Sequence, residues 1–432
     1  MSEPDGTLPA GSPRGHRGPS SVARVGVAIA VASAAGYALL VLVGRSLTPA
    51  DFALFVAFWG VLFGLGSSLS TVEQETARVA ASEDGQDTGP PAHAVAAAAA
   101  LLATLVAATT LLPAVAERLY GDPDSRMGLL VTAAALGFAV QFAVRGRLMG
   151  RGAVQSYGWL VVTEAVVRLV VLGVVIVAAG VDLWTAGVAV TIGSFAWLGW
   201  AHRARGVLPR WSPSLRTWAA AAERAATLML AAGLSAAIIT GYPTMVAALT
   251  SEQPGAAGGA VFAALTVSRV PLLLVSPVQA FTVPYVVRAQ AQATTSAVPP
   301  LQRGLLVGTA TAVAAGLLGG VVGHLAGPWV VRLVYGAAYE VSGLAVGLLV
   351  LSAFLLAWVL LLSAALVALS SHRGMILMWA AGAGSTAGWL LISPLPLVET
   401  TAVGALVGPC VAAAVALPLL WGLVRRAPHR SR

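Results

Sequence analysis

The stretch VARVGVAIAVASAAGYALLVLVG, residues 22–44, decides the class of fold. Its only charged side chain is Arg24. An α-helix needs about 20 apolar residues to cross the hydrocarbon core of a bilayer, and this run reaches that length. It is also longer than the apolar segment of a cleaved secretion signal. The run therefore predicts an uncleaved first transmembrane helix.

The composition extends this prediction to the whole chain. Of 432 residues, 58% are hydrophobic and only 10% are charged, and the mean hydropathy is +0.85. A soluble domain carries roughly a quarter charged residues, so this chain cannot cover a water-facing surface. We expect an all-α multi-pass membrane protein with about twelve transmembrane helices. The further apolar runs are residues 52–70, 93–116, 127–147, 157–180, 183–202, 222–249, 257–285, 301–325, 342–370, 374–394 and 400–424.

Polar segments divide these runs into two sets of six. Residues 1–21 are rich in Gly, Pro and Ser and predict a disordered tail. An N-terminal lobe is expected over 22–202 and a C-terminal lobe over 222–424, with a cytoplasmic linker at 203–221 between them. Residues 425–432 form a basic tail. An even number of spans places both termini on one side of the membrane.

The arginines indicate which side that is. Short loops rich in Arg stay in the cytoplasm. With the N-terminus inside, the outer loops hold few arginines, namely Arg45, Arg118, Arg126 and Arg332. The inner segments hold the larger set, which includes Arg145, Arg147, Arg151, Arg203, Arg205, Arg210, Arg216, Arg288, Arg303, Arg373, Arg425 and Arg426. We therefore expect cytoplasmic N- and C-termini in the cell membrane.

Several kinds of chemistry are excluded by residue types. Every basic residue apart from the six histidines is arginine, so the chain has no Walker A lysine and no Schiff-base lysine. Its single cysteine, Cys410, excludes an internal disulfide and a cysteine-based metal site. We expect no catalytic residue, no metal and no cofactor. The net charge of +8 lies mostly in inner loops, where it serves membrane insertion and attracts anionic lipid rather than nucleic acid.

A short repeat relates the two halves. RLYG at 118–121 follows the third apolar run, and RLVYG at 332–336 follows the ninth. The same position in each set of six spans predicts two parallel six-helix bundles. This is a transporter architecture in which the substrate site lies between the halves.

Four segments resemble a known family. They are GRSLTPADFALF (44–55), VRGRLMGRGAVQSYG (144–158), VFAALTVSRVPLLLVSPVQAFTVPYVVR (261–288) and VVRLVYGAAYE (330–340). Each is similar to the corresponding segment of the polysaccharide-transport branch of the multidrug/oligosaccharidyl-lipid/polysaccharide (MOP) flippase superfamily. The resemblance implies two six-helix bundles in a V that move undecaprenyl-pyrophosphate-linked oligosaccharides outward by alternating access. It also implies glycosyltransferase partners upstream and a polymerase or ligase downstream.

Charged side chains inside the spans are the candidate site. An ionised side chain at mid-bilayer costs at least about 2.5–3.5 kcal/mol, so each needs a partner or a function. Glu164 and Arg168 are spaced i, i+4 and share one helix face. Arg269 has no acid within one turn. We expect Arg168 and Arg269 to bind pyrophosphate, because guanidinium grips phosphate bidentately, and Glu164 to respond to a coupling ion. The alternative is purely structural pairing.

Charged side chains also lie near the cytoplasmic ends of the first two spans. Arg24 begins the first span and is a further candidate for contact with pyrophosphate. Glu73 and Arg78 end the second and are candidates for a rim that receives the head group. The alternative for these residues is simple snorkelling to the interface.

Three other classes of function remain open. The Asp122-Pro123-Asp124 turn has the Asp-x-Asp form of metal-dependent sugar transferases, but such residues are also typical of turns. A drug or cation exporter of the same superfamily is expected, by resemblance, to carry an acid within the first or seventh span, where this chain has none beyond Glu223 at a span start. A non-transporting partner of polysaccharide synthases is the third alternative.

Overall fold

A computed structural model describes residues 19–81, 91–200, 215–274 and 300–426, with the isolated positions 202, 282, 284–286 and 288. Regular structure in these residues is helical, without a strand. The expected disordered tail lies outside the described residues up to residue 18, as do residues 203–214 of the expected linker and 427–432 of the basic tail.

The helices of the first half alternate between the two ends of the molecule. They are α1 (Pro19–Ser46), α2 (Pro49–Ala81), α3 (Ala92–Ala108), the 3₁₀ turn η1 (Thr109–Leu111), α4 (Pro113–Tyr120), α5 (Arg126–Gly150), α6 (Val154–Ala178), α7 (Leu183–Ile192) and the 3₁₀ segment η2 (Gly193–Trp200). Those of the second half are α9 (Leu215–Ile239), α10 (Tyr242–Leu249), α11 (Gly255–Ser268), the 3₁₀ segment η3 (Val270–Leu274), α13 (Pro300–Tyr335), α14 (Gly343–Ala368), α15 (His372–Ile392) and α16 (Leu397–Arg426).

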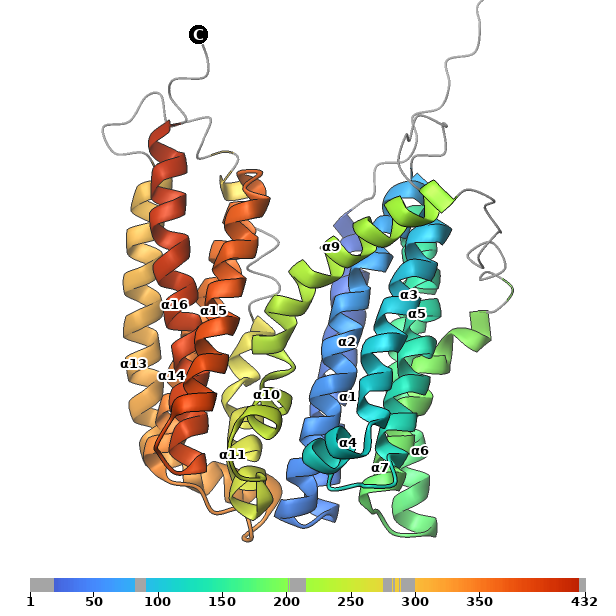
Figure 1. Ribbon diagram of the computed structural model, residues 1–432. Coiled ribbons are helices and arrows are strands. Elements are labelled where there is room, and N and C mark those ends of the chain that lie inside the picture. Colours follow the sequence, from blue (N-terminus) through green and yellow to red (C-terminus); the bar gives the residue numbers. More distant parts are fainter. Residues whose placement is uncertain are drawn as a thin grey trace, which may run out of the picture.

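Twelve helical segments of the described chain are long and apolar enough to cross a membrane. Each overlaps one of the twelve apolar runs of the sequence, so the prediction of an all-α multi-pass fold is confirmed. In Figure 1, α1 begins at the end of the molecule where α16 finishes, as an even number of spans requires.

Three predicted spans are broken or displaced in the structure, each beside a proline. The run 93–116 ends as a helix at Ala108, and Pro113 starts the separate α4. The run 222–249 divides after Ile239, because Pro243 has no N–H to continue the helix. Within the run 257–285, α11 ends at Ser268, three residues before Pro271, and the 3₁₀ segment η3 begins at Val270. Residues 215–221, expected in the linker, are instead the first turns of α9.

Two groups of helices stand apart at one end of the molecule and meet at the other (Figure 1). Helices α1 to α7 form one group and α13 to α16 the other, with α9, α10 and α11 crossing between them. One core cluster joins α2, α3 and α5 to α10, α11 and the lower part of α14. A second cluster lies within α13 to α16.

Small residues allow these helices to approach closely, which is the main source of packing energy between helices in lipid. A Cβ atom at Gly259 of α11 would lie 1.8 Å from the carbonyl oxygen of Pro49 at the start of α2. A Cβ atom at Gly319 of α13 would lie 2.7 Å from the Phe354 ring of α14. The glycines therefore set the spacing both between the groups and within them.

The two groups are tied together at the end of the molecule where α1 finishes. The Arg45 Nε donates to the Val334 carbonyl at 2.6 Å, and the Tyr339 hydroxyl donates to the Gly44 carbonyl at 2.6 Å. The Phe52 ring lies 5.3 Å from the Tyr335 ring and packs edge-on against Tyr339. We call Arg45, Phe52, Val334, Tyr335 and Tyr339 the closed end. Under the predicted topology it faces outward.

Candidate functional site

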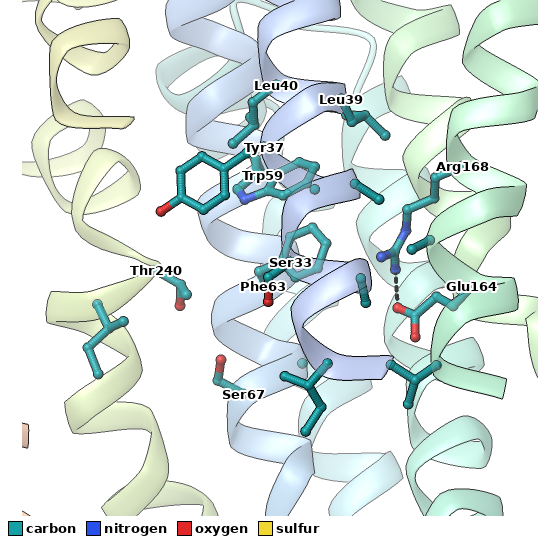
Figure 2. Close-up of a pocket in the computed structure, with 18 of the residues that line it drawn as sticks. Ser33, Tyr37, Leu39, Leu40, Trp59, Phe63, Ser67, Glu164, Arg168 and Thr240 are labelled. Atoms are coloured by element: carbon teal, nitrogen blue, oxygen red, sulfur yellow. Dashed lines mark hydrogen bonds and ion pairs between the residues drawn. The ribbon is translucent and has the colours of Figure 1, made fainter. Parts of the chain in front are cut away.

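A cavity of about 610 Å³ lies between the first group of helices and the crossing helices α9 to α11. Its walls come from α1, α2, α5, α6 and α11 and from the break between α9 and α10. The wall is mostly apolar and aromatic, with a few charged and hydroxyl side chains (Figure 2). This composition is typical of sites for small molecules, which occupy about 300–1,000 Å³.

Four side chains form a charged cluster in one wall. Glu164 of α6 accepts hydrogen bonds from the guanidinium groups of Arg168, one turn further along α6, and of Arg145 of α5. The Gln141 amide of α5 donates to the same carboxylate at 2.7 Å. Figure 2 shows the Arg168–Glu164 pair beside the cavity. Both carboxylate oxygens are therefore engaged, and two cations share one anion.

The cluster is buried, and neighbouring backbone groups of α7 and η2 bond to the Arg168 side chain and leave space for it. The side chains of Arg145, Glu164 and Arg168 are 11%, 8% and 9% exposed. The Arg168 Nε also donates to the Val190 carbonyl at 3.1 Å. A Cβ atom at Gly193 would lie 2.4 Å from that Nε atom, so only glycine leaves space for the arginine there.

Aromatic rings support the cationic groups. The Arg168 guanidinium lies over Phe63 at 5.0 Å and near Phe138 at 5.7 Å, and Arg145 lies over Phe142 at 5.2 Å. A desolvated cation over an aromatic face gains about 2 kcal/mol. These contacts help to offset the burial of two positive charges beside a single carboxylate.

The cluster keeps unused hydrogen-bonding capacity. Among the described residues, the Arg145 Nε and the Gln141 side-chain oxygen are buried without a partner. Buried polar atoms of this kind are rare in folded proteins and commonly mark a site for water or a ligand. A phosphate group presents acceptor oxygens of the same kind as the Glu164 carboxylate and suits the same guanidinium donors.

Arg269 lines the same cavity from another wall. It caps the C-terminus of α11, and its guanidinium donates to the Ile239 carbonyl and, at 3.0 Å, to the Ile238 carbonyl. These carbonyls are left free where α9 ends. The guanidinium also lies 6.0 Å from the Tyr242 ring. Arg269 therefore has backbone partners, which the sequence did not predict, and it ties together the ends of two interrupted helices.

The other predicted residues lie outside the cavity. Arg24 is exposed on the first turns of α1 and is absent from the cavity wall. Glu73 is half-buried on α2, close enough to Arg145 to interact with it electrostatically. Arg78 is 44% exposed and pairs with Glu75 at 2.9 Å. The structure therefore brings Arg168, Glu164 and Arg269 together around one space and separates Arg24 and Arg78 from them.

Glu75, which lies on α2 between Glu73 and Arg78, forms an ion pair with Arg224 of α9. Its buried carboxylate accepts two hydrogen bonds from Arg224 of α9, at 2.8 and 3.0 Å, in addition to those from Arg78. This ion pair attaches α9 to α2 at the end of the molecule opposite the closed end. It is therefore a further connection between the halves of the chain.

Sequence reasoning missed Arg145 and Gln141. The charge pattern assigns Arg145 to an inner loop, but α5 runs on to Gly150 and places it inside the helix. A signal was present, because Gln141 and Arg145 are spaced i, i+4 and share a helix face, as Glu164 and Arg168 do. Two such polar pairs on consecutive spans predict a contact between them.

Solved structures share this fold. The inward-facing conformation of a multidrug resistance MATE family transporter of the MOP superfamily matches with a TM-score of 0.67 and 16% identity, covering 95% of this chain and 100% of that one. The outward-facing conformation of such a transporter matches with a TM-score of 0.57 and 17% identity, covering 96% of this chain and 98% of that one. A MOP superfamily transporter from Pyrococcus furiosus matches with a TM-score of 0.56 and 16% identity, covering 94% of this chain and 96% of that one. In that transporter, the reverse polarity of the binding pocket is said to suggest a different function. The chain therefore has the fold of MOP-superfamily transporters.

Relatives in sequence are mycobacterial. The chain is 32% identical over 424 residues to the Mycobacterium tuberculosis protein Rv1510, covering 94% of this chain and 92% of the relative. It is 32% identical over 424 residues to the M. tuberculosis protein Rv3630, covering 93% and 92%. Both relatives are described as uncharacterized. No protein-family model matches the chain. The chain belongs to the same family as these mycobacterial proteins.

Proposed function

We propose that the protein is a flippase-like transporter that moves undecaprenyl-pyrophosphate-linked oligosaccharide from the cytoplasmic to the outer face of the cell membrane. The observation that carries this proposal is the charge of the cavity wall. Among the described residues, three arginines, Arg145, Arg168 and Arg269, line the cavity against a single acid, Glu164. A cavity with this excess of guanidinium groups suits an anionic cargo, and pyrophosphate is an anion that guanidinium binds bidentately.

The cargo is expected to compete with Glu164. In the structure the Glu164 carboxylate forms ion pairs with both Arg145 and Arg168. A pyrophosphate entering the cavity offers these guanidinium groups an alternative acceptor. Protonation of Glu164 would release them in the same way, which makes Glu164 the proposed coupling site. Arg269 keeps N–H groups beyond those given to Ile238 and Ile239, because guanidinium has five donors.

Alternating access is supported by the arrangement of the two helix groups. The closed end joins them at one face of the membrane, and the shape is more similar to the inward-facing MATE structure than to the outward-facing one. Under the proposal, the head group enters from the cytoplasm while the lipid tail stays in the bilayer. Arg24 is exposed outside the cavity wall, so the proposal does not use it to hold pyrophosphate. Glu73 and Arg78 remain near the cytoplasmic mouth.

A drug or cation exporter is less well supported. Such a protein needs an acid that is free to meet a cationic cargo. Glu164 is the only acid that lines the cavity among the described residues, and two arginines already engage it. The polarity of the wall therefore favours anions. Glycosyltransferases that supply the cargo and a polymerase or ligase that consumes it remain the proposed partners.

The test is a flipping assay in proteoliposomes. Fluorescent undecaprenyl-pyrophosphate oligosaccharide is loaded, and its appearance in the outer leaflet is followed for the wild type, Arg168→Ala and Glu223→Ala. Glu223 is an exposed acid on α9 and serves as the matched control. We expect movement with the wild type and the control and a loss of at least about tenfold with Arg168→Ala. Movement of a cationic dye in place of the glycolipid would support the exporter, and movement of neither would support a non-transporting partner.

A further inference from the structure

A second polar region of the cavity lies on α1 and α2. Trp59, Phe63 and Ser67 follow one another at four-residue spacing on α2, and Ser33 and Tyr37 do so on α1, so each set forms one stripe along its helix. All five residues line the cavity. Figure 2 shows the hydroxyl groups of Ser33, Tyr37 and Ser67 on the side of these helices that faces the α9–α10 break. We call these five side chains the hydroxyl–aromatic stripe.

The hydroxyl groups of the stripe have no hydrogen-bond partner among the described residues, although the charge of Arg269 acts on the Tyr37 hydroxyl. Within the described part of the chain, no hydrogen bond joins Ser33, Tyr37 or Ser67 side chains to another group. Neighbouring serines behave differently, since Ser68 and Ser70 donate to carbonyls of their own helix at 3.1 and 2.7 Å. A polar group at membrane depth without an internal partner needs water or a ligand. The stripe therefore offers several free donors and acceptors to whatever fills the cavity.

The aromatic members of the stripe connect it to the charged cluster. The Trp59 and Phe63 rings lie 4.1 Å apart between centroids, and the Phe63 ring carries the Arg168 guanidinium at 5.0 Å. A bound molecule can thus meet an aromatic surface and a cation within one continuous wall. Both rings are only partly buried, which leaves part of each accessible from the cavity.

This combination matches the surface of a sugar ring. A pyranose presents C–H groups on its faces and hydroxyl groups around its edge, so it packs on aromatic rings and bonds to neutral hydroxyls. Trp and Tyr combine an apolar face with a polar tip and suit such a ligand. The stripe itself contains no charged side chain, and the cation that acts on it is Arg269, which lines the same cavity and interacts electrostatically with the Tyr37 hydroxyl.

We propose that the hydroxyl–aromatic stripe is a carbohydrate subsite that recognises the first sugar attached to the pyrophosphate of the cargo. The inference rests on the proposed function, because it places the sugar beside an anion held at Arg168. Trp59 provides the stacking surface, and Ser33, Tyr37 and Ser67 exchange hydrogen bonds with the sugar hydroxyls. The cavity of about 610 Å³ has room for both parts of such a head group.

The test compares two probes bound to the full chain in lipid nanodiscs, without sugar-based detergent. One probe is farnesyl pyrophosphate, and the other is the same lipid pyrophosphate carrying one N-acetylhexosamine. Variants are Trp59→Ala, Trp59→Phe and Ser67→Ala, with Trp159→Ala as the matched control because Trp159 is 60% exposed on α6. Thermal unfolding of each variant verifies that it is folded.

We expect the wild type to bind the glycosylated probe about tenfold more tightly than the bare lipid pyrophosphate. Trp59→Ala should reduce this preference to less than about threefold without weakening the bare lipid, while Trp59→Phe and Trp159→Ala keep most of it. A preference that survives Trp59→Ala and Ser67→Ala, or a wild type without preference, overturns the subsite but leaves the proposed function standing. Failure of the wild type to bind either probe overturns both. Ser67→Ala, which should also lower the preference because it removes a hydroxyl group of the stripe, keeps the test informative if Trp59→Ala does not fold.

Discussion

Glu164 forms ion pairs with two arginines, whereas each of these arginines has its ion pair with Glu164. This difference determines how much stability each single substitution removes. Glu164→Ala removes the ion-pair partner that Arg145 and Arg168 share and leaves only the electrostatic interaction of Arg145 with Glu73, whereas Arg168→Ala leaves Glu164 with Arg145. Removing one partner of a buried ion pair costs about 3–5 kcal/mol, because the remaining charge stays desolvated. The glutamate is therefore the residue on which the cluster depends most for stability.

The first prediction ranks these changes in stability. We expect Glu164→Ala to lower the unfolding temperature most, Arg168→Ala less, and Glu223→Ala hardly at all, since Glu223 is exposed and its loss is worth about 0–1 kcal/mol. Thermal unfolding in nanodiscs measures all three. A larger loss for Arg168→Ala than for Glu164→Ala would contradict the shared-anion arrangement.

The second prediction concerns the space around Arg168. Gly193→Ala places a Cβ atom 2.4 Å from the Arg168 Nε, so the arginine must move out of the cluster. Gly199→Ala, on the same 3₁₀ segment, meets nothing within 4 Å. We expect Gly193→Ala to impair flipping by at least about tenfold and Gly199→Ala to leave it unchanged. Equal activity of the two variants would show that the position of Arg168 does not matter.

At the scale of helices, one cap depends on a charged group outside the membrane spans. Asp182 accepts from the Thr185 backbone N–H at 2.7 Å at the start of α7, and the Thr185 side chain completes a capping box. These hydrogen bonds lower the pKa of the Asp182 carboxyl below its ordinary value. A lowered folded-state pKa gives stability that is present above the unfolded value, about 3.9, and is lost as the pH falls through the folded value.

The third prediction follows from this cap. Asp182→Ala should destabilise the protein at neutral pH by roughly 0.5–2 kcal/mol, the usual cost of losing an N-cap. Asp182→Asn should cost less, since asparagine caps almost as well, and it should remove this contribution to acid sensitivity. Unfolding temperatures of the wild type and both variants between pH 7 and pH 3 provide the measurement. The wild-type advantage over Asp182→Ala should shrink toward acid pH, and an advantage that grows instead would contradict a lowered pKa at Asp182.

Most of the helix layout could be predicted from the sequence, and the exceptions have a common physical origin. Length and apolarity are enough to place twelve spans, because lipid demands continuous apolar helices. They do not show where a helix stops inside an apolar run, as α9 does at Ile239 and α11 at Ser268. Carbonyl groups freed at such breaks need partners from distant sequence. Arg269 supplies them, and no local pattern around it indicates this.

The candidate site could be predicted in part for a similar reason. Glu164 and Arg168 lie one turn apart, so their pairing follows from helix geometry alone. The contact of Arg145 with Glu164 depends on the packing of α5 against α6 and on where α5 ends. The hydroxyl–aromatic stripe needs α1 and α2 placed side by side along one cavity. Tertiary packing, rather than residue type, determines both the Arg145–Glu164 contact and the formation of the stripe.

At the scale of the whole molecule, the closed end is the part that must open if the cavity is to empty on that side. Its bonds, from Arg45 to Val334 and from Tyr339 to Gly44, join the two helix groups directly. Each bond is worth about 0.5–1.5 kcal/mol. Removing these two hydrogen bonds should shift the population toward the conformation that is open at the closed end. The packing within each group of helices should not change.

The fourth prediction tests this with spin labels. In a Cys410→Ala background, labels at Leu112 and Leu395, both exposed near the closed end, report the separation of the two groups. Arg45→Ala combined with Tyr339→Phe should raise the long-distance population in double electron–electron resonance by several-fold. Labels within one group, at Leu112 and Trp184, should show no change. An unaltered Leu112–Leu395 distribution would mean that these bonds do not hold the closed end.

The central claim is that the cavity arginines bind an anionic cargo. In the absence of cargo, the Glu164 carboxylate takes the place of that anion at Arg145 and Arg168. The most direct measurement is the affinity of farnesyl pyrophosphate for the protein in nanodiscs, for the wild type, Glu164→Gln, Arg168→Ala and the exposed control Glu223→Gln. The account predicts binding about tenfold tighter for Glu164→Gln, at least about tenfold weaker for Arg168→Ala, and unchanged for the control. Equal affinities for the wild type, Glu164→Gln and Arg168→Ala would contradict it.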